Sequence, residues 1–278
     1  MKKKKVALVV GASSGIGEKV ARRLATSKCI VYGVARRTKR LEHLKKAGVH
    51  IAYMDVTKTE SIEAVIRHIL DQHGYIDIVI NNAGYGEYGI LEEVSIENAK
   101  QQFDVNLFGV ARVNQCVLPV MRKQKSGRII VVASSASHVA TLGSGWYGAS
   151  KHALKGLVEA QRMEVYPFNI QLVQIEPGPI KTEFETTAIE TLNAQEAIED
   201  YKELRYNYMW FLKHMFAKAP SAFSTVDTIV KASLIKKPKN TYRTTGSAKL
   251  LPILRGILGS HMYLKSVHHV ILRKGRIK

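Results

Sequence analysis

The segment that most constrains the fold is an apolar run that ends in a glycine-rich turn near the start of the chain. Residues 6–10 (VALVV) are apolar and mostly β-branched, and the sequence GASSGIG follows from Gly11 to Gly17. A helix-periodic pattern then continues to about Thr26. Strand, glycine turn and helix in this order form a layout that holds a dinucleotide, because the free amides and dipole of the helix N-terminus favour phosphate.

The end of the second apolar run bears on the choice of cofactor. Arg36 and Arg37 follow residues 30–35 (IVYGVA), and no Asp or Glu occurs between Glu18 and Glu42. An NAD-binding protein places a carboxylate here, on the ribose 2′-hydroxyl, whereas arginine suits the 2′-phosphate of NADP. The arginines could also simply begin a basic helix, but this does not explain the missing carboxylate. The pattern therefore favours NADP(H).

Apolar runs and helix-periodic segments continue to alternate along the chain. Further strands are predicted at residues 50–54, 76–80, 127–134, 170–175 and 241–244, with helices at about 60–73, 95–124 and 226–236. Repeated units of this length imply a parallel sheet with helices on both faces. The predicted fold class is therefore α/β, a Rossmann-type doubly wound parallel sheet whose ligands bind at the carboxyl ends of the strands.

Near the middle of the chain, Tyr147 and Lys151 stand four residues apart at the head of a helix-periodic segment. They share a helix face, so the lysine ammonium can lie beside the phenol. A nearby cation lowers the pKa of a phenol from about 10, which would fit this tyrosine for acid/base work. Tyr and Lys are also common on helix surfaces, but of the 12 tyrosines only Tyr147 has a lysine at this spacing.

Several motifs together resemble one known family. GASSGIG, NNAG (81–84), a segment around Asn106, GRIIVVASS (127–135), YGASK (147–151) and PGPIKT (177–182) occur in the order and spacing of the short-chain dehydrogenase/reductase family. The resemblance covers roughly residues 5–185. It implies an NADP-preferring oxidoreductase similar to the hydroxysteroid and retinol dehydrogenases of that family.

Carried over position by position, the resemblance implies a catalytic tetrad of Asn106, Ser134, Tyr147 and Lys151. Two serines compete for the second role. Ser134 stands seven residues after Gly127 and 13 before Tyr147, which is the family's spacing, and Ser135 is the alternative. His138 follows in a segment where the family tends to carry glycine, and we expect it to be a loop or pocket-wall residue.

The same resemblance implies which residues surround the cofactor. Asp55 and Val56 would lie at the adenine, Asn82 beside the ribose and Thr182 near the nicotinamide amide. The full set expected to bind the cofactor comprises Gly11, Ser13, Ser14, Gly15, Ile16, Gly17, Arg36, Arg37, Asp55, Val56, Asn82, Ala83, Gly84, Tyr147, Lys151, Pro177, Gly178, Ile180 and Thr182.

Substrate choice is expected to depend on segments outside these motifs. Val139, Leu142 and Trp146, beside the catalytic serine and tyrosine, are expected to be pocket walls. Residues 183–220 are helix-prone and rich in aromatic and Met side chains, and would cover the site as a lid; they could equally be helix core or a subunit contact. We expect a single domain, 1–278, with its core at 5–182 and 221–246 and a basic amphipathic C-terminal extension at 247–278.

Charge limits the choice of partners. The net charge is +19, and the chain from Thr228 onward carries 12 Lys and Arg without Asp or Glu. Such a tail can lie on an anionic membrane, pack on the pocket or another subunit, or serve solubility alone. It lacks an identifiable recognition motif, so no nucleic-acid partner is expected.

Cysteine usage and hydropathy bear on the compartment. Cys29 and Cys116 stand far apart without metal-ligand spacing, so neither a disulfide framework nor a metal site is predicted, and a reducing cytoplasm is expected. No apolar run approaches the roughly 20 residues of a membrane span. We expect a homo-oligomer that contacts membranes peripherally if at all.

The predicted activity is NADP(H)-dependent hydride transfer between nicotinamide and the ketone or secondary alcohol of a hydrophobic, steroid-, retinoid- or lipid-like substrate. One alternative is a 3-oxoacyl thioester reductase, whose acidic carrier protein would dock on the basic surface. Another is a non-catalytic NADP-binding regulator, which would keep the glycine turn and lose members of the tetrad. All four members are present here.

Overall fold

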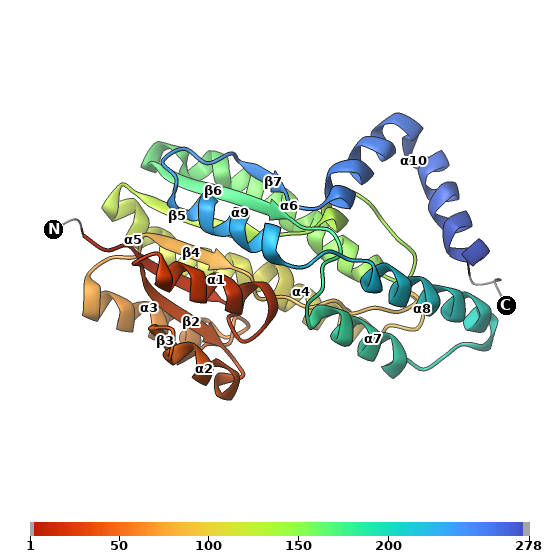
Figure 1. The fold of residues 1–278 in the computed structure, drawn as a ribbon, viewed down its shortest axis with the longest axis horizontal. Helices are drawn as coiled ribbons and strands as arrows, with labels where there is room; N and C mark the ends of the chain where they lie inside the picture. Colours follow the sequence, from red (N-terminus) through yellow and green to blue (C-terminus); the bar gives the residue numbers. More distant parts are fainter. Residues whose placement is uncertain (1–2, 275–278) are drawn as a thin grey trace.

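The protein is described by a computed structural model over residues 3–274, in which helices surround a seven-stranded parallel sheet (Figure 1). The strands are β1 (Val6–Val10), β2 (Ile30–Ala35), β3 (Val49–Tyr53), β4 (Ile78–Asn81), β5 (Gly127–Val132), β6 (Ile170–Glu176) and β7 (Thr241–Arg243). Their order is β3-β2-β1-β4-β5-β6-β7, so the winding reverses between β1 and β4. This confirms the predicted doubly wound α/β fold, and the reversal marks the place where such sheets bind ligands.

The central strands are buried on both faces, as their unbroken apolar sequences predict. Along β1, Val6, Leu8 and Val10 belong to one core and Ala7 and Val9 to the other, because side chains alternate along a strand. Helices α3 (Thr59–His73), α5 (Gly109–Gln124) and α6 (Gly145–Val165) cover the first core, and α1 (Gly15–Thr26), α2 (Glu42–Lys45) and α9 (Phe223–Leu234) cover the second. Short 3-10 turns occur at Thr38–Leu41, Ser135–Ser137, Tyr166–Phe168 and Glu199–Tyr201.

The long helix predicted over 95–124 is interrupted. Helix α4 (Ile96–Phe103) passes into a π-helical turn, η2 (Asp104–Phe108), before α5 begins. Ser95 caps α4 by accepting a hydrogen bond from the Asn98 backbone amide at 3.1 Å, as expected for a serine at this position. The segment is helical from Ile96 to Gln124, as predicted; the π turn within it was not, because it keeps helical hydrogen bonding and inserts a single extra residue, which hardly changes the apolar pattern.

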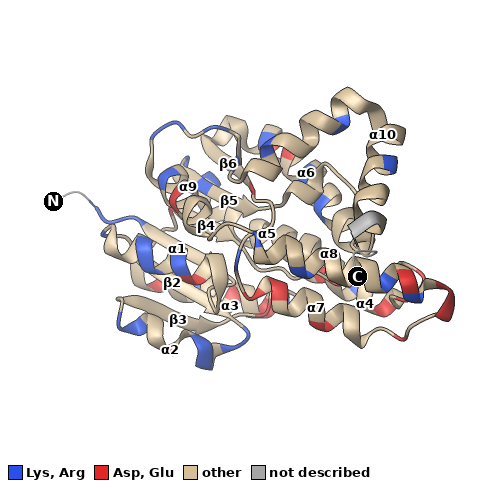
Figure 2. Ribbon diagram, turned by 45° about the vertical axis from the view of Figure 1, so that its right-hand side comes forward, with Lys and Arg blue, Asp and Glu red and all other residues tan. Residues whose placement is uncertain are grey.

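Residues 184–217 form two helices beyond the carboxyl edge of the sheet, α7 (Phe184–Ala194) and α8 (Lys202–Ala217). They enclose a third apolar cluster that includes Leu192, Leu212 and Phe216 from these helices and Tyr147 from α6. The loop between them carries Asp and Glu, whereas Lys and Arg line α1 and the α2 region (Figure 2). The helices predicted as a lid therefore pack directly against the tyrosine singled out from the sequence.

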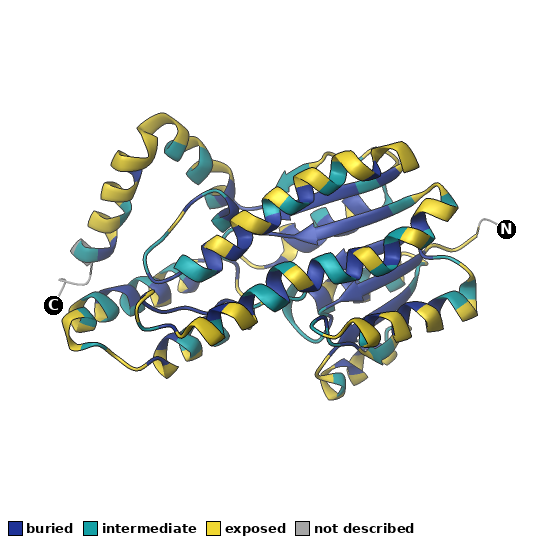
Figure 3. Cartoon of the chain, turned by 180° about the vertical axis from the view of Figure 1, so that it is seen from behind, coloured by how far each residue is buried: buried dark blue, intermediate teal, exposed yellow. Residues whose placement is uncertain are grey.

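The chain ends in α10 (Gly246–Lys274), which projects from the body and bends at Gly259, where φ is +69° and ψ is +165° (Figures 1 and 3). A non-glycine residue would be strained in this conformation. Tyr263 and Ile271 are buried, and α10 contacts α8. Several large apolar side chains of α10 remain exposed, among them Leu250, Ile253, Ile257, Leu258, Met262, Leu264 and Val270. Among residues 3–274, no helix combines the length and the hydropathy needed to cross a bilayer.

Candidate active site

A cavity of about 630 Å³ lies at the carboxyl ends of the strands. Its walls come from the segments that follow each of the strands β1 to β6, together with α6, the α7–α8 pair and the first part of α10. Residues that are far apart in the sequence meet here because parallel strands deliver their carboxyl ends to one edge of the sheet.

The glycine turn after β1 forms one end of the cavity. Gly11 has φ +82°, and a Cβ there would lie only 2.7 Å from the backbone of Ala83, which follows β4. A Cβ on Gly17 would lie 2.2 Å from the Gly11 carbonyl oxygen, so α1 can pack this closely only with glycine. Gly11, Ser13, Ser14, Gly15 and Ile16 line the cavity, whereas Gly17 packs behind them.

The N-terminus of α1 is open toward this cavity. Ser14 occupies the N-cap position, and its side chain makes no capping hydrogen bond to the first turn of the helix. The first amides of a helix lack partners within the helix, and an anion can take that place. Asn82 steadies the turn by donating from Nδ2 to the Gly11 carbonyl at 3.0 Å. The open amides and the close glycine packing fit the pyrophosphate of a dinucleotide.

The end of β2 supplies positive charge to the same cavity. Arg36 and Arg37 are exposed and line it, and among the described residues neither makes a salt bridge. The next arginine, Arg40, is instead paired with Glu183 at 2.5 Å. Two cations without carboxylate partners are therefore available to a phosphate at this end.

Of the two residues expected at the adenine, only one lines the cavity. Val56 does, together with Met54, whereas Asp55 does not. The Asp55 carboxylate accepts hydrogen bonds from the backbone and hydroxyl of Thr57 at 3.0 and 2.8 Å. Burial raises the pKa of Asp55, but these bonds and the charges of Arg36 and Lys58 lower it overall. In this structure its side chain shapes the turn after β3.

Ser134, Tyr147 and Lys151 line the opposite part of the cavity and are all buried. Helix α6 begins at Gly145 and places Tyr147 and Lys151 one turn apart. The Lys151 Nζ lies 5.8 Å from the Tyr147 ring centroid and donates to the Val132 carbonyl at 3.3 Å. Ser134 ends the strand segment and accepts a hydrogen bond from the Ala136 amide at 3.1 Å. The predicted group of serine, tyrosine and lysine is therefore assembled on one wall.

Burial is the main influence on the pKa values of Tyr147 and Lys151. It raises the pKa of Tyr147 to about 12, and a hydrogen bond with the Ser134 hydroxyl acts in the opposite direction. It also lowers the pKa of Lys151 to about 8. The expected lowering of the phenol pKa by the lysine is not observed, because burial deprives both groups of water that would stabilise their charged forms. The serine that interacts with Tyr147 is Ser134, although Ser135 also lines the cavity.

Asn106 lies in the π turn behind this wall and is fully buried. Its Nδ2 donates to the Tyr85 carbonyl at 2.8 Å and to the Ser150 hydroxyl at 3.2 Å, and its Oδ1 accepts from the Tyr85 amide at 3.0 Å. A Cβ on Gly84 would lie 2.9 Å from Oδ1 of Asn106 and 3.7 Å from Nζ of Lys151. Gly84 therefore lies between Asn106 and Lys151, and the hydrogen bonds from Asn106 to Tyr85 fix the segment that contains this glycine.

The segment after β6 completes the cofactor side. Pro177, Gly178, Ile180 and Thr182 line the cavity, as do Asn82, Ala83 and Gly84. The Ser135 amide donates to the Pro177 carbonyl at 2.8 Å, which joins this segment to the serine loop. The Gly178 amide donates to the Thr245 hydroxyl at 3.0 Å. A backbone hydrogen bond therefore joins the loop after β5 to the loop after β6, and the Thr245 side chain holds the second loop.

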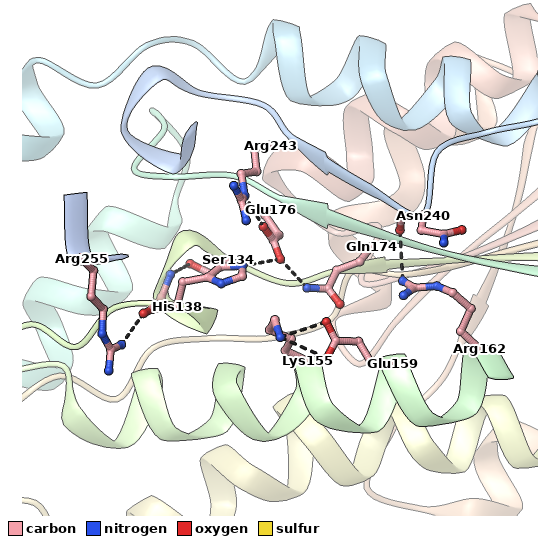
Figure 4. A network of polar contacts seen from close by, with 11 residues as sticks. Ser134, His138, Lys155, Glu159, Arg162, Gln174, Glu176, Asn240, Arg243 and Arg255 are labelled. Carbon is pink, nitrogen blue, oxygen red and sulfur yellow. Dashed lines mark hydrogen bonds and ion pairs between the residues drawn. The ribbon is translucent and has the colours of Figure 1, made fainter. Parts of the chain in front are cut away.

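A buried polar network behind these loops was missed by the sequence analysis (Figure 4). Glu176, the last residue of β6, is almost fully buried, and its carboxylate is bonded by His138 at 2.8 Å, Gln174 at 2.6 Å and Arg243 at 3.1 Å. Burial raises the pKa of Glu176, but the hydrogen bonds and charges of His138 and Arg243 lower it overall. His138 does not line the cavity and holds the serine loop instead. A glutamate in an apolar strand, directly before Pro177, was the available signal.

Only one of the three expected pocket-wall residues lines the cavity. Val139 does, whereas Leu142 packs on the third apolar cluster and Trp146 stacks edge-on against Phe103 at 6.4 Å between centroids. Leu142 and Trp146 therefore do not line the cavity in this structure, and for Trp146 the reason is geometric. Trp146 directly precedes Tyr147 on α6, and neighbouring residues on a helix point about 100° apart.

The remaining walls come from residues that the motifs do not mark. Tyr88 and Phe184 pack on the Tyr147 ring at 5.7 and 5.5 Å between centroids. Further cavity residues outside the predicted set include Glu87, Gln101, Thr141, Ser144, Thr187, Thr191, Met215, Phe216 and Leu251. Their positions depend on how the lid helices and α10 fold back over the sheet. Within residues 3–274 no cluster of three or more His, Cys, Asp or Glu is arranged to hold a metal ion.

Comparisons with known proteins agree with this geometry. The model of the short chain dehydrogenase family matches residues 5–193. The chain is 34% identical over 272 residues to the probable short-chain type dehydrogenase/reductase VdlC of Helicobacter pylori, covering 98% of this chain and 99% of that protein. It is 30% identical over 291 residues to retinol dehydrogenase 8 of Bos taurus, covering 97% and 91%. A solved short-chain dehydrogenase from Streptomyces avermitilis is similar with a TM-score of 0.79 and 28% identity, over 92% of this chain and 95% of that one.

Proposed function

The chain belongs to the short-chain dehydrogenase/reductase family, and on that premise we propose that it is an NADP(H)-dependent oxidoreductase for the ketone or secondary alcohol of a hydrophobic substrate. One observation carries the proposal. A single cavity has open helix amides and unpaired arginines on one side and the Ser134, Tyr147 and Lys151 group on the other. Phosphate binding and proton transfer are thus available in one connected space.

Each residue of the catalytic group has a role in this proposal. Nicotinamide, when bound, supplies or accepts a hydride. Tyr147 gives its proton to the carbonyl oxygen, or takes it back from the alcohol, and Ser134 hydrogen-bonds the same oxygen and stabilises its developing charge. Lys151, with a pKa of about 8, is mostly protonated at neutral pH. Its charge then favours the phenolate that forms as Tyr147 loses its proton, and its ammonium can hold the ribose hydroxyls.

Asn106 is assigned a supporting role. Its hydrogen bonds to Tyr85 and Ser150 hold the segment 84–86 beside α6. We assign to Asn106 the task of keeping a water path open between Lys151 and solvent, by which the proton given up at Tyr147 is replaced.

The preference for NADP(H) rests on Arg36 and Arg37. Both line the cavity at the end of β2, where a ribose 2′-phosphate would lie, and guanidinium groups bind phosphate with paired hydrogen bonds. The Asp55 carboxylate is bonded by Thr57 in the turn after β3, and the Glu183 carboxylate, which lines the cavity, is already paired with Arg40. NADP(H) is therefore the proposed cofactor.

The proposal of an apolar substrate rests on the other walls. Tyr88, Phe184, Met215, Phe216 and Leu251 face the cavity around Tyr147. Aromatic and Met side chains give a large and adaptable apolar surface. A relative of nearly the same length is a retinol dehydrogenase by name, which points to the same class of substrate.

The test is turnover by the purified full chain. A panel of steroid, retinoid and alkyl ketones and alcohols is offered with NADPH, NADP⁺, NADH and NAD⁺, and absorbance of the reduced nicotinamide is followed. We expect NADPH-dependent reduction of apolar ketones. Faster turnover of 3-oxoacyl carrier-protein thioesters than of free ketones would favour the alternative reductase, whose acidic partner would dock on the basic surface. No turnover of any carbonyl or alcohol would contradict the proposal.

Helix α10 is proposed as a site of peripheral contact with an anionic membrane. Its exposed apolar side chains lie on a helix that projects from the body, and no acidic residue occurs from Thr228 onward to oppose anionic lipid. Flotation with vesicles of phosphatidylserine and phosphatidylcholine tests this, and Ile253→Ser with Ile257→Ser should abolish it. Lack of binding together with a dimer that these substitutions dissociate would assign the same face to a homo-oligomer.

Cys29 and Cys116 are both free thiols, which suits the proposed cytoplasmic location.

A further inference from the structure

The cavity contains one buried charged group that the proposed chemistry does not use, the carboxylate of Glu87. This residue is 7% exposed and lines the cavity. It directly precedes Tyr88, whose ring packs on the ring of Tyr147. Glu87 therefore belongs to the part of the cavity that receives the substrate, next to the residues that would surround its carbonyl.

The protein holds this carboxylate in place from one side only. The Glu87 amide donates to Gln102 at 2.6 Å, which fixes the backbone. Gln195 and Asn98 both donate to the same carboxylate oxygen, Oε1, at 2.7 and 3.3 Å. Within residues 3–274, no hydrogen bond reaches the second oxygen, Oε2, and no Lys or Arg forms a salt bridge with Glu87. One oxygen of a fixed carboxylate is thus left for another partner.

Two other buried glutamates show what such a group ordinarily requires. Glu93 and Glu176, with side chains 0% and 1% exposed, pair with Arg205 at 2.6 Å and Arg243 at 3.1 Å. A buried carboxylate is costly unless it is paired and hydrogen-bonded. Burial accordingly raises the pKa of Glu87, against the lowering effect of Gln195 and Asn98. A cation that enters the cavity would supply the missing partner.

We propose that Glu87 binds a protonated amine of the substrate, so that the preferred substrates are apolar carbonyl compounds or alcohols that also carry an ammonium group. This inference rests on the proposed function, since it concerns the same cavity. The apolar rings of Tyr88, Phe184 and Phe216 would cover the hydrocarbon part, and the carboxylate would fix the polar end. An ion pair in a site shielded from water gives orientation as well as affinity, because only one placement of the ligand satisfies both ends.

The test measures binding separately from turnover. Isothermal titration calorimetry compares a straight-chain alkyl amine with the alcohol of the same chain length, each added to the full chain saturated with NADPH, which can reduce neither ligand. We expect the amine to bind at least about tenfold more tightly to the wild type, and Glu87→Gln to remove this advantage while the alcohol keeps its affinity. Glu92→Gln is the matched control, because Glu92 is exposed, bonds Tyr201 and does not line the cavity.

Three results would overturn the inference. Equal affinity of amine and alcohol in the wild type requires no variant and counts against it directly. Equal weakening of both ligands by Glu87→Gln would show that the residue only holds the lid helix through Gln195. Reduction of plain alkyl ketones in parallel assays separates this inference from the proposed function. Turnover without any preference for amino ketones defeats the inference alone, and absence of all turnover defeats the proposed function.

Discussion

Nε2 of His138 lies 2.8 Å from Oε1 of Glu176, and this contact ties the loop that carries Ser134 to the strand that leads into the proposed nicotinamide segment. Arg243 of β7 binds the other oxygen of Glu176, and Arg255 of α10 donates to the His138 carbonyl. Elements from the last part of the chain thus brace the two loops that meet at the catalytic wall (Figure 4).

Replacing Glu176 with Gln should reduce the free energy of unfolding by about 1.5–3 kcal/mol at neutral pH, because a buried charged carboxylate no longer bonds His138 and the partly exposed Arg243. The partners hold the pKa of Glu176 below its usual value. Its contribution is therefore complete above the unfolded pKa of about 4.3 and is lost as the pH falls through the lower folded value. The difference between wild type and variant should shrink below about pH 4.

Urea unfolding at neutral and acid pH measures this difference. Glu159→Gln is the control, because Glu159 pairs with Lys155 on the surface and exposed pairs contribute about 1 kcal/mol or less. A loss of stability that is the same at both pH values would contradict the role assigned to the Glu176 charge.

Replacing Tyr147 with Phe should lower kcat by about a hundredfold to ten-thousandfold, the range attributed to general acid–base groups. The ring and its packing on Tyr88 remain, so the dissociation constant for NADPH, measured by fluorescence, should stay the same. Tyr166→Phe removes a hydroxyl from an exposed ring and serves as the control. Near-full activity of the Tyr147 variant would remove the tyrosine from the mechanism.

The pKa of Lys151 predicts a pH dependence. Burial lowers this pKa to about 8, so the positive charge is present below that pH and is lost above it. Accordingly, kcat/KM for carbonyl reduction should decline as the pH rises through about 8. Lys151→Arg should move the decline to higher pH, since arginine stays protonated, and Lys151→Met should be slow at every pH. A flat wild-type profile up to about pH 10 would rule out this role.

Replacing Arg36 with Asp should raise the KM for NADPH by about tenfold to a hundredfold and leave the KM for NADH nearly unchanged, because a charged hydrogen bond to phosphate contributes about 1.5–3 kcal/mol. Lys39→Asp makes the same change of charge at an exposed residue that does not line the cavity. If both variants alter the preference for NADPH equally, the effect comes from net charge and not from a phosphate site.

The fold could be predicted closely where the signal was local. The strand β2 has the predicted bounds, Ile30–Ala35, because a short β-branched run between turn residues leaves little choice. The π turn at Asp104–Phe108 could not be predicted, since its extra residue is stabilised by the buried bonds of Asn106 to Tyr85 and Ser150.

The residues of the candidate site also divide into those that local motifs predict and those that they do not. Gly11, Tyr147 and Lys151 lie in contiguous motifs whose spacing alone brings them to the cavity. Glu87 and Glu176 depend on partners more than 60 residues away, Gln195 and Arg243 among them. Trp146 shows the opposite case. It directly precedes Tyr147 in the sequence, which suggested a place in the cavity wall, but the helix points its side chain at Phe103 instead.

The bend at Gly259 divides α10 into two parts that make different contacts. The part before it contributes Leu251 to the cavity and Arg255 to the brace on His138, so its sequence is tied to the reaction. The part after it touches neither the cavity nor the brace among the described residues. Gly259 adopts a positive φ that other residues rarely take, and this allows the chain to change direction between the two parts. Substitutions in the outer half should therefore leave the cavity and the loop that carries His138 unchanged.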